Sequence, residues 1–203
     1  MRLEWSKQNI QKWSVGSDHC NEGDAMKDMT EIDLLTENNL KNDVDALSLS
    51  LFCHEPFTLI NDKVINQLKE SSLLKGNVNI RVCLHSDIDN NLHDMIILMR
   101  NESYCRPHMH TNTDETVQII EGKLLIILFE ENGNILSTGI IKDNEMTRIP
   151  VGTFHTQMSL TPYVIFHESK SGPFIRDESV FAKWSPQKQS KEGLAYDLLL
   201  KNK

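Results

Sequence analysis

Residues 104–122 constrain the fold of this chain more than any other stretch. They read YCRPHMHTNTDETVQIIEG and carry three side chains that can ligate a metal ion, His108, His110 and Glu115. Side chains at positions i and i+2 of an extended strand share a face, so the two histidines point the same way. The turn-forming residues 111–114 can reverse the chain and return Glu115 over that pair. The stretch therefore predicts a strand–loop–strand unit that holds a metal ion.

A fourth candidate ligand follows a second turn. In the stretch IPVGTFHTQMS, Pro150 and Gly152 predict a tight turn, and His155 opens the strand that comes after it. Gln157 shares the face of His155 in that strand, which makes it a candidate to hydrogen-bond a substrate. We therefore expect this strand to complete the metal site and to contribute to a binding surface beside it.

The residues just before the histidine pair are candidates for substrate contact. By strand alternation, Tyr104 and Arg106 should share the inward face, where Arg106 could grip a carboxylate or phosphate in bidentate fashion. A structural salt bridge is the alternative role for Arg106, and filling a barrel end is the alternative for Tyr104. The pattern leaves these roles open.

The two motifs together resemble those of the cupin superfamily. The matching positions are His108, His110, Glu115 and Gly122 in the first motif and Pro150, Gly152 and His155 in the second. Glu102 and Asn144 stand where glycines usually open the motifs; asparagine tolerates left-handed backbone geometry, whereas Glu102 suggests a differently shaped turn. The resemblance implies an all-β fold, a double-stranded β-helix or jelly-roll barrel, with one divalent metal ion held by the two motifs.

From about residue 57 to residue 186 the chain resembles, more narrowly, the WbuC family of cupin-fold metalloproteins. The stretches that carry this resemblance are an N-terminal helix, Leu84-His85, residues 104–110, residues 152–156, residues 168–174 and the run Phe181-Ala182-x-Trp184-x-Pro186. The chain departs from the family at Asp94, Thr113 and Asp114, which implies a different substrate if those positions contact it. Association of such proteins with surface-polysaccharide gene clusters implies a sugar or nucleotide-sugar substrate.

Three further residues are candidates for moving protons. Glu168 and Lys170 share a face on a later strand and could serve as proton donor and acceptor, although a cross-strand ion pair is the alternative. His85 ends a strand where the family also has histidine, so it is a candidate proton shuttle or else a hydrogen-bonded structural residue. His167 has the opposite parity and should face outward, and His93 lies in a loop-like context and is discounted.

The rest of the chain predicts short strands around one helix. Asn61 should cap a helix that ends near Lys75-Gly76, with Val64, Ile65, Leu68 and Leu73 as its apolar stripe. Residues 79–84 and 95–99 alternate like strands, and residues 130–134 carry an Asn-Gly hairpin signal. Short strands at these intervals indicate an all-β barrel rather than alternating strands and helices.

Three regions follow from this pattern. Residues 1–56 form an N-terminal extension of unclear structure, in which DALSLSLF alternates like a strand while Ile32, Leu35 and Leu40 also fit a helix. Residues 57–187 are the cupin barrel with its preceding helix. Residues 188–203 are a C-terminal tail with leucines at helical spacing.

Composition narrows the partners and the compartment. A formal charge of −8 without a basic cluster argues against nucleic acid and acidic membrane surfaces, and no window approaches the ~20 apolar residues of a membrane span. The N-terminus lacks a signal-peptide core, so we expect a cytoplasmic protein. Its widely spaced cysteines, Cys20, Cys53, Cys83 and Cys105, should be free thiols. The expected partners are a small-molecule ligand and, because cupins often pair barrels, a second copy in a homodimer.

The sequence leaves three functions open. The first is a metal-dependent isomerase, epimerase or lyase that acts on a small polar metabolite, such as a sugar or nucleotide-sugar in surface polysaccharide biosynthesis. The second is a cupin dioxygenase that depends on iron, manganese or copper, and the third is a metal-bearing binding module without chemistry. Imidazole and carboxylate ligands suit Fe, Zn, Mn, Ni or Cu, so the ligand set does not select the metal.

Overall fold

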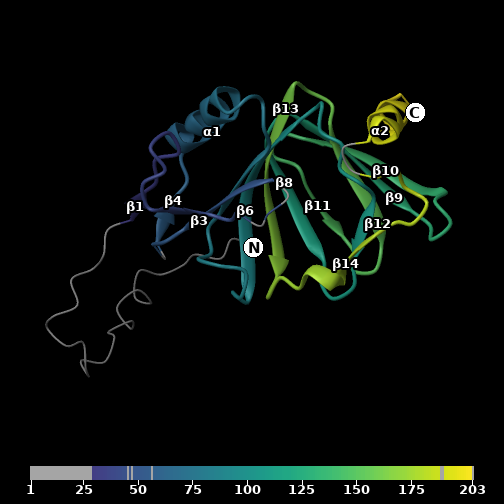
Figure 1. The fold of residues 1–203 in the computed structure, drawn as a ribbon, viewed down its shortest axis with the longest axis horizontal. Coiled ribbons are helices and arrows are strands. Elements are labelled where there is room, and N and C mark those ends of the chain that lie inside the picture. The colour runs from purple at the N-terminus through teal and green to yellow at the C-terminus, as the bar shows by residue number, and fades with distance from the viewer. Residues whose placement is uncertain (1–28, 45, 47, 56, 188–189, 203) are drawn as a thin grey trace, which may run out of the picture.

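The computed structural model describes residues 29–44, 46, 48–55, 57–187 and 190–202, and two β-sheets make up most of it (Figure 1). The larger sheet has the order β11-β8-β13-β6-β5-β3-β2 and the smaller has the order β10-β9-β12-β7-β14. The strands of the larger sheet are β2 (Leu40–Asn42), β3 (Leu49–Cys53), β5 (Ile80–Cys83), β6 (Leu92–Arg100), β8 (Glu115–Glu121), β11 (Met146–Ile149) and β13 (Tyr163–Ser171). Those of the smaller sheet are β7 (His108–His110), β9 (Lys123–Phe129), β10 (Ile135–Lys142), β12 (Phe154–Ser159) and β14 (Ser179–Phe181).

Successive strands from β6 onward alternate between the two sheets. Strands β6, β8, β11 and β13 belong to the larger sheet and β7, β9, β12 and β14 to the smaller, while β9 and β10 form a hairpin. All ladders between these strands are antiparallel. This connectivity is that of a jelly-roll barrel. The predicted fold class, an all-β barrel of the cupin type with a preceding helix, is confirmed.

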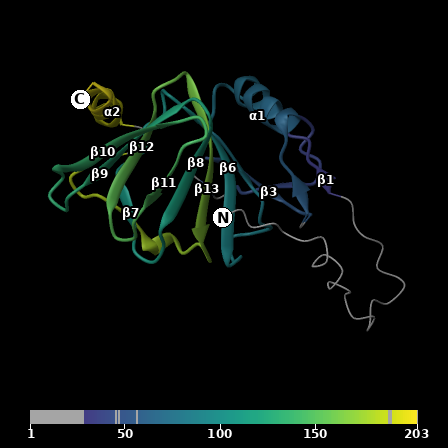
Figure 2. The ribbon, with the colours of Figure 1, turned by 180° about the vertical axis from the view of Figure 1, so that it is seen from behind.

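The remaining elements flank the barrel. Strands β1 (Thr30–Glu31) and β4 (Thr58–Leu59) pair in parallel, and helix α1 (Asp62–Leu74) follows them. A short 3-10 helix, η2 (Arg176–Glu178), precedes β14, and helix α2 (Lys191–Lys201) ends the described chain. Figures 1 and 2 show α1 and α2 on opposite sides of the barrel. No helix among the described residues is long and apolar enough to cross a membrane.

Helix α1 begins where the sequence predicts. The side chain of Asn61 accepts a hydrogen bond from the backbone N–H of Val64 at 3.2 Å, which caps the helix, and Lys75 ends it. Val64 and Leu68 are buried as expected. Leu73, in contrast, is 60% exposed, because it lies in the last turn, beyond the apolar cluster that the helix covers. The predicted stripe is therefore one turn too long.

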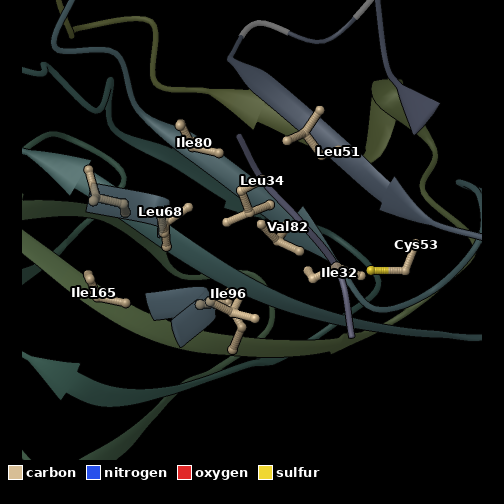
Figure 3. Packing of buried hydrophobic residues seen from close by; sticks show 11 residues of the cluster. Ile32, Leu34, Leu51, Cys53, Leu68, Ile80, Val82, Ile96 and Ile165 are labelled. Atoms are coloured by element: carbon tan, nitrogen blue, oxygen red, sulfur yellow. The ribbon is translucent and has the colours of Figure 1, made fainter. Parts of the chain in front are cut away.

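The face of the larger sheet under α1 holds one apolar cluster (Figure 3). Its members come from α1, from β3, β5, β6 and β13, and from the chain around residues 32–34, and they are Ile32, Leu34, Leu51, Cys53, Val64, Leu68, Ile80, Val82, Ile96, Leu98 and Ile165. In Figure 3, Ile32 and Leu34 lie among Leu68, Val82 and Ile96. Burial of this cluster fixes α1 to the sheet through the hydrophobic effect.

Alternation along the strands produces two further clusters. Odd-numbered Met95 and Ile97 of β6 face the barrel interior with Phe166 of β13, while their even-numbered neighbours join the cluster under α1. On β9, Leu125 and Ile127 turn outward and pack with Phe129, Met158 and Leu200, the last of which belongs to α2. Each helix thus covers the outer face of one sheet and leaves the barrel interior to the strands.

The described part of the N-terminal extension adds strands to the barrel. Strand β3 pairs in parallel with β5, and β2 pairs with β3 at the edge of the larger sheet. Within the stretch DALSLSLF, whose alternation indicates a strand, residues 49–52 belong to β3. The helical alternative for Ile32, Leu35 and Leu40 is wrong, because Ile32 is buried under α1, Leu35 is 44% exposed and Leu40 starts β2. Cys53, Cys83 and Cys105 form no disulfide among the described residues, and Cys20 lies outside them.

Three turn residues adopt the left-handed backbone that the sequence indicates. Gly122 (φ +99°) ends β8, and a side chain there would meet the hydroxyl of Thr161 at 2.7 Å. Asn144 has φ +66°, so it accepts the geometry usually given to glycine at that position. Gly133 (φ +91°) closes the predicted hairpin and lies against the ring of Trp184, which a Cβ atom would meet at 2.9 Å. Backbone geometry and close packing both require glycine at the first and third of these positions.

Packing under α1 can be tested with a matched pair of leucines. We expect Leu68→Ala to lower the free energy of unfolding by about 2–5 kcal/mol, because Leu68 is fully buried and its loss leaves a cavity. Leu74, in the last turn of the same helix, is 74% exposed. We expect Leu74→Ala to change the stability by less than about 0.5 kcal/mol. Urea unfolding of both variants measures this, and equal destabilisation would contradict the packing.

Candidate metal centre

Three barrel strands bring the predicted ligands together. Strand β7 carries His108 and His110, and β12 pairs with it so that His155 lies opposite His108. Strand β8 begins with Glu115. The two motif turns are fastened to each other, because Gly152 (φ +72°) donates its N–H to the carbonyl of His110 at 2.8 Å. The strand–loop–strand prediction and the second turn motif therefore meet in one site.

Asp114 fixes the loop between the first two strands. Its carboxylate accepts the backbone N–H of Val151 at 2.8 Å and contacts the guanidinium of Arg148 at 2.5 Å. Thr113, the preceding residue, is hydrogen-bonded to the side chain and backbone of Ser171 on β13. Two of the positions where the chain departs from the WbuC pattern thus connect the first motif to the second motif and to β13. The third, Asp94, accepts from His167 on the outer face at 3.1 Å.

The three imidazoles face one another. Their ligand nitrogens all lie within 4.8 Å of one another, and the ring centroids of His108 and His155 are 4.5 Å apart. His110 and His155 are almost fully buried. Three neutral imidazoles at such spacing are compatible with one divalent metal ion.

The outer nitrogen of each ring is occupied. His108 Nδ1 lies 3.0 Å from the carbonyl of Arg106, and His155 Nδ1 lies 2.9 Å from the carbonyl of Thr153. His110 Nδ1 lies 3.1 Å from the hydroxyl of Ser179 on β14. A carbonyl only accepts, so Nδ1 carries the proton in the first two rings and Nε2 presents its lone pair inward. This is the tautomer that a metal ligand requires.

Glu115 completes the group. Its carboxylate oxygens lie 2.8 Å from His110 Nε2 and 3.2 Å from His155 Nε2. Neither contact has hydrogen-bond geometry, so both Nε2 atoms and Glu115 Oε2 are buried without a hydrogen-bond partner among the described residues. Buried polar atoms without partners cost free energy, and a cation among them would satisfy all three at once. The donor set therefore fits a metal ion.

The electrostatics of the site favour neutral imidazoles beside an ionised carboxylate. Burial lowers the pKa of His108 and of His110 below the usual value of histidine. Burial opposes ionisation of Glu115, but the charge of Lys170 and the nearby imidazoles outweigh it and hold the pKa of Glu115 well below its usual range. These are the protonation states in which the residues bind metal.

Lys170 is the cation next to the ligands. It stands directly opposite Glu115 in the β13–β8 ladder, and its ammonium lies 3.1 Å from Glu115 and 3.7 Å from Glu168. The structure thus places Glu168 and Lys170 on the inward face, as predicted, but as an ion-paired group with Glu115 rather than as two separate side chains. Glu168 is 5% exposed. The two alternatives predicted from the sequence are therefore both partly met. The side chains converge on the site, and Lys170 also forms ion pairs with Glu115 and Glu168.

A small pocket opens beside this group. It reaches the metal centre at His110 and Lys170, and Ser179 also lines it. The rest of its wall is Asn112, Thr113, Ser171, Glu178, Pro173, Phe174, Ile175 and His93. Its cavity volume is about 10 Å³, which is close to the space that one water molecule needs.

The histidine in this pocket is His93 rather than His85. The two rings stack at 4.1 Å, and His85 lies behind His93 against the ring of Phe52. The sequence predicts a strand that starts at residue 95, which leaves His93 in a loop-like context. Strand β6 instead starts at residue 92, so alternation puts His93 on the inward face. His85 does not line the pocket, so it does not directly contact a molecule there, as its predicted role in proton transfer requires.

Tyr104 and Arg106 do not share the inward face. Strand β7 starts only at His108, because Pro107 has no N–H to pair, so strand parity does not extend to them. The hydroxyl of Tyr104 donates to the carbonyl of Pro186 at 3.2 Å, and its ring packs against Tyr196 of α2. The expectation that both point toward the metal is wrong.

Arg106 holds the C-terminal segment instead. Its guanidinium donates to the side chain of Ser185 at 3.0 Å, to the side chain of Gln187 at 3.0 Å and to the carbonyl of Ala182 at 3.1 Å. It also lies 5.0 Å from the ring centroid of Phe181, whose ring is 6.2 Å from that of His108. The alternative role of Arg106, a structural salt bridge, is not seen among the described residues; the guanidinium instead holds the segment that carries β14.

Two other residues complete the account of the site. Gln157 is buried on β12, two residues after His155 and on the same face, as predicted. Ser179, which orients His110, was missed because β14 is three residues long and its pairing with β7 is a contact between distant parts of the chain. The aromatic residues between Gly172 and Pro186 single out this segment in the sequence, but they do not indicate that it pairs with β7.

Comparisons with known proteins give one partial family match and several similar solved structures. A family described as "Domain of unknown function (DUF6016)" matches residues 60–141, which is less than half of the chain, so the narrower WbuC resemblance stays a prediction. No curated protein matches the sequence. Similar solved structures include oxalate decarboxylase from Bacillus subtilis, at 17% identity and a TM-score of 0.42 over 51% of this chain and 27% of that chain.

Two further solved structures are similar over a comparable part. KdgF from Halomonas sp. matches at 17% identity and a TM-score of 0.39, covering 49% of this chain and 82% of that chain. Procruciferin, an 11S globulin from Brassica napus, matches at 16% identity and a TM-score of 0.37, covering 41% of this chain and 21% of that chain. The chain thus spans about a fifth of the length of procruciferin and just over a quarter of that of the decarboxylase. The strand order and the site geometry carry the assignment of the fold.

The clamp formed by Arg106 predicts a local effect. We expect Arg106→Ala to increase hydrogen exchange in residues 181–187 and to lower the free energy of unfolding by about 1–3 kcal/mol, because the guanidinium bonds to four groups there. Lys183→Ala, which truncates an exposed lysine within the same segment, serves as the control. Exchange in residues 181–187 that is unchanged in Arg106→Ala would contradict the clamp.

The stacked histidines predict a pH dependence of stability. Burial lowers the pKa of His85 to about 4 from an unfolded value of about 6.5. The unfolded chain therefore binds the proton first, so the contribution of His85 to stability is complete above pH 6.5 and is lost as the pH falls toward 4. Denaturant unfolding should show that the free energy of unfolding falls less between pH 6.5 and pH 4 in His85→Gln than in the wild type. His54→Gln, which removes an exposed histidine, is the control, and an unchanged slope in His85→Gln would contradict the prediction.

Proposed function

We propose that this protein is a metal-dependent enzyme acting on a small polar metabolite such as a sugar or nucleotide-sugar. One observation carries the proposal: three inward-facing Nε2 atoms and a buried carboxylate converge, while each Nδ1 is held from outside. Hydrogen bonds to the nitrogen that faces away from the metal set the tautomer of metal-binding histidines. His108, His110, His155 and Glu115 would hold the ion.

The chemistry that fits this site is proton transfer. A divalent ion, when bound, would polarise a carbonyl or hydroxyl oxygen of the metabolite. Lys170 lies at the pocket wall and can donate a proton from its ammonium, and its contact with Glu168 at 3.7 Å holds that group in place. His93, a buried imidazole in the same wall, can accept a proton. A donor and an acceptor on one pocket support an isomerase, epimerase or lyase.

The WbuC resemblance supports the substrate class. It suggests a step in the synthesis of surface polysaccharides, with a sugar or nucleotide-sugar as the molecule that enters the pocket. The polar wall of Asn112, Thr113 and Ser171 offers amide and hydroxyl groups for such a ligand. Mass spectrometry of small molecules released by unfolding the natively purified protein would test this. Release of a hydroxyl-free ligand in stoichiometric amount would contradict it.

Metal content tests the ligand assignment. We expect about one equivalent of a divalent metal in the wild type, and clearly less in His108→Ala and in Glu115→Ala, since each loses one ligand. His167→Ala is a matched control, because His167 lies on the outer face of β13 against Asp94. Elemental analysis of the four purified proteins is the measurement. Stoichiometric metal retained in both ligand variants would refute the site.

The identity of the metal tests the reaction class. Zinc, or another ion without oxygen uptake in the presence of candidate sugars, is the expected result for a Lewis-acid isomerase or lyase. Iron, manganese or copper together with oxygen consumption during turnover would refute it in favour of a dioxygenase. Elemental analysis with an oxygen electrode distinguishes the two outcomes.

A further inference from the structure

The pocket beside the metal centre is too small for the molecule that the proposed function requires. Its cavity volume of about 10 Å³ is close to the space that one water molecule needs. A sugar ring needs several times that space. In this conformation the pocket therefore admits water but no metabolite.

One short segment supplies much of the wall that closes this pocket. Residues 172–178, which we call the strap, connect β13 to β14 and include η2. Figure 1 shows the strap crossing from the tip of β13 to β14 at the lower end of the barrel. Four of its residues line the pocket, namely Pro173, Phe174, Ile175 and Glu178. The rest of the wall belongs to β6, β7, β13, β14 and the turn after β7.

The start of the strap is held by the loop that precedes β6. Gly172 donates its N–H to the carbonyl of Asn91 at 2.9 Å, and Phe174 donates its N–H to the carbonyl of Ile88 at 2.8 Å. The same Ile88 carbonyl lies 3.2 Å from Nε2 of His93 in the pocket wall. The loop that receives these bonds, residues 86–91, is itself mostly exposed. Two exposed segments thus meet over the pocket through backbone hydrogen bonds.

The end of the strap is held by the strand that carries the histidine pair. Thr111, which follows β7, donates its N–H to the carbonyl of Glu178 at 3.0 Å. The next residue, Ser179, stands opposite His110 in the β14–β7 ladder and lies 3.1 Å from its Nδ1. This end is therefore tied to the barrel, and a hinge at Glu178 would leave β14 and the orientation of His110 unchanged.

Closure of the strap buries little apolar surface. Phe174 and Ile175 are 37% and 47% exposed, and neither belongs to one of the three buried apolar clusters. Closure also leaves Oε2 of Glu178 buried without a hydrogen-bond partner among the described residues, which costs free energy. Opening would break the hydrogen bonds to residues 88 and 91, but it would expose little apolar surface and would hydrate that oxygen. Segments held in this way open locally at low cost.

From these observations we infer that the strap is a lid over the metal centre. Residues 172–177 move away from the loop before β6, about the hinge at Glu178, and so admit a metabolite to the metal. The closed form keeps molecules larger than water away from the metal between turnovers, as lids of other enzymes do. The inference rests on the proposed metal-dependent function, because it concerns how the metabolite reaches that site.

A disulfide that locks the strap tests this inference. The hydrogen bond between residues 174 and 88 places two exposed side chains next to each other, so Ile88→Cys/Phe174→Cys can form a disulfide across it. Imidazole is the probe, because it is larger than water and changes the visible spectrum of Co²⁺ when it coordinates the ion. We expect the oxidised, Co²⁺-loaded double variant to bind imidazole at least about a hundredfold more slowly than its reduced form, which should match the wild type.

Phe174→Cys alone, treated with the same oxidant, is the matched control. It carries the substitution in the strap but has no partner thiol at residue 88, so we expect it to bind imidazole at the rate of the reduced double variant. Equal rates in the oxidised and reduced double variant would overturn the inference. A Co²⁺ spectrum of the wild type that imidazole leaves unchanged would also overturn it, because the strap would then not open to a ligand.

Hydrogen exchange of the wild type, resolved by residue, tests the opening without a metal or a ligand. We expect the amides of Gly172 and Phe174 to have protection factors within about twofold of each other, because one opening releases both. The amide of Thr111, bonded at the hinge, should be at least about tenfold better protected. Protection of Gly172 and Phe174 equal to that of Glu168 in β13 would overturn the lid. A wild type that binds no Co²⁺ would refute the metal function, whereas the exchange pattern would still decide whether the strap opens.

Discussion

The site depends on one buried carboxylate that both sheets share. Glu115 starts β8 of the larger sheet, contacts Lys170 on the neighbouring β13, and faces His110 and His155 from β7 and β12 of the smaller sheet. A charge buried in this way is costly unless it is paired, so the lysine and a bound cation decide whether the arrangement is stable. A metal ion bound there would link the two sheets through Glu115 and the three histidines.

The C-terminal segment finishes what the two motifs begin. Strand β14 pairs with β7, places Ser179 behind His110, and brings Glu178 into the pocket, while Arg106 and Pro107 fasten residues 181–187. This segment has little strand structure of its own and is held by hydrogen bonds from residues far away in the chain, so its position is set by the barrel rather than by its own propensity. The pocket is thus formed by the strands of the jelly roll together with a segment that pairs at its edge.

Much of the fold and the four ligands could be predicted from sequence because their signals are local. Asn61 caps α1 through its own side chain, and the i, i+2 spacing of His108 and His110 places both on one face wherever a strand forms. The same rule of alternation fails for Arg106, two residues before His108. Pro107 ends the strand ladder, so alternation does not extend to Arg106. Its side chain instead bonds to Ser185 and Gln187, about 80 residues further along the chain.

The sequence by itself determined the class of fold, the helix before the barrel and which side chains can ligate a metal, because strand alternation and turn chemistry act over a few residues. The tertiary structure decided which polar groups surround that metal. His93 rather than His85 lines the pocket, and Ser179 orients His110. Each of these depends on contacts between residues distant in the chain, which register and packing fix and local patterns do not encode.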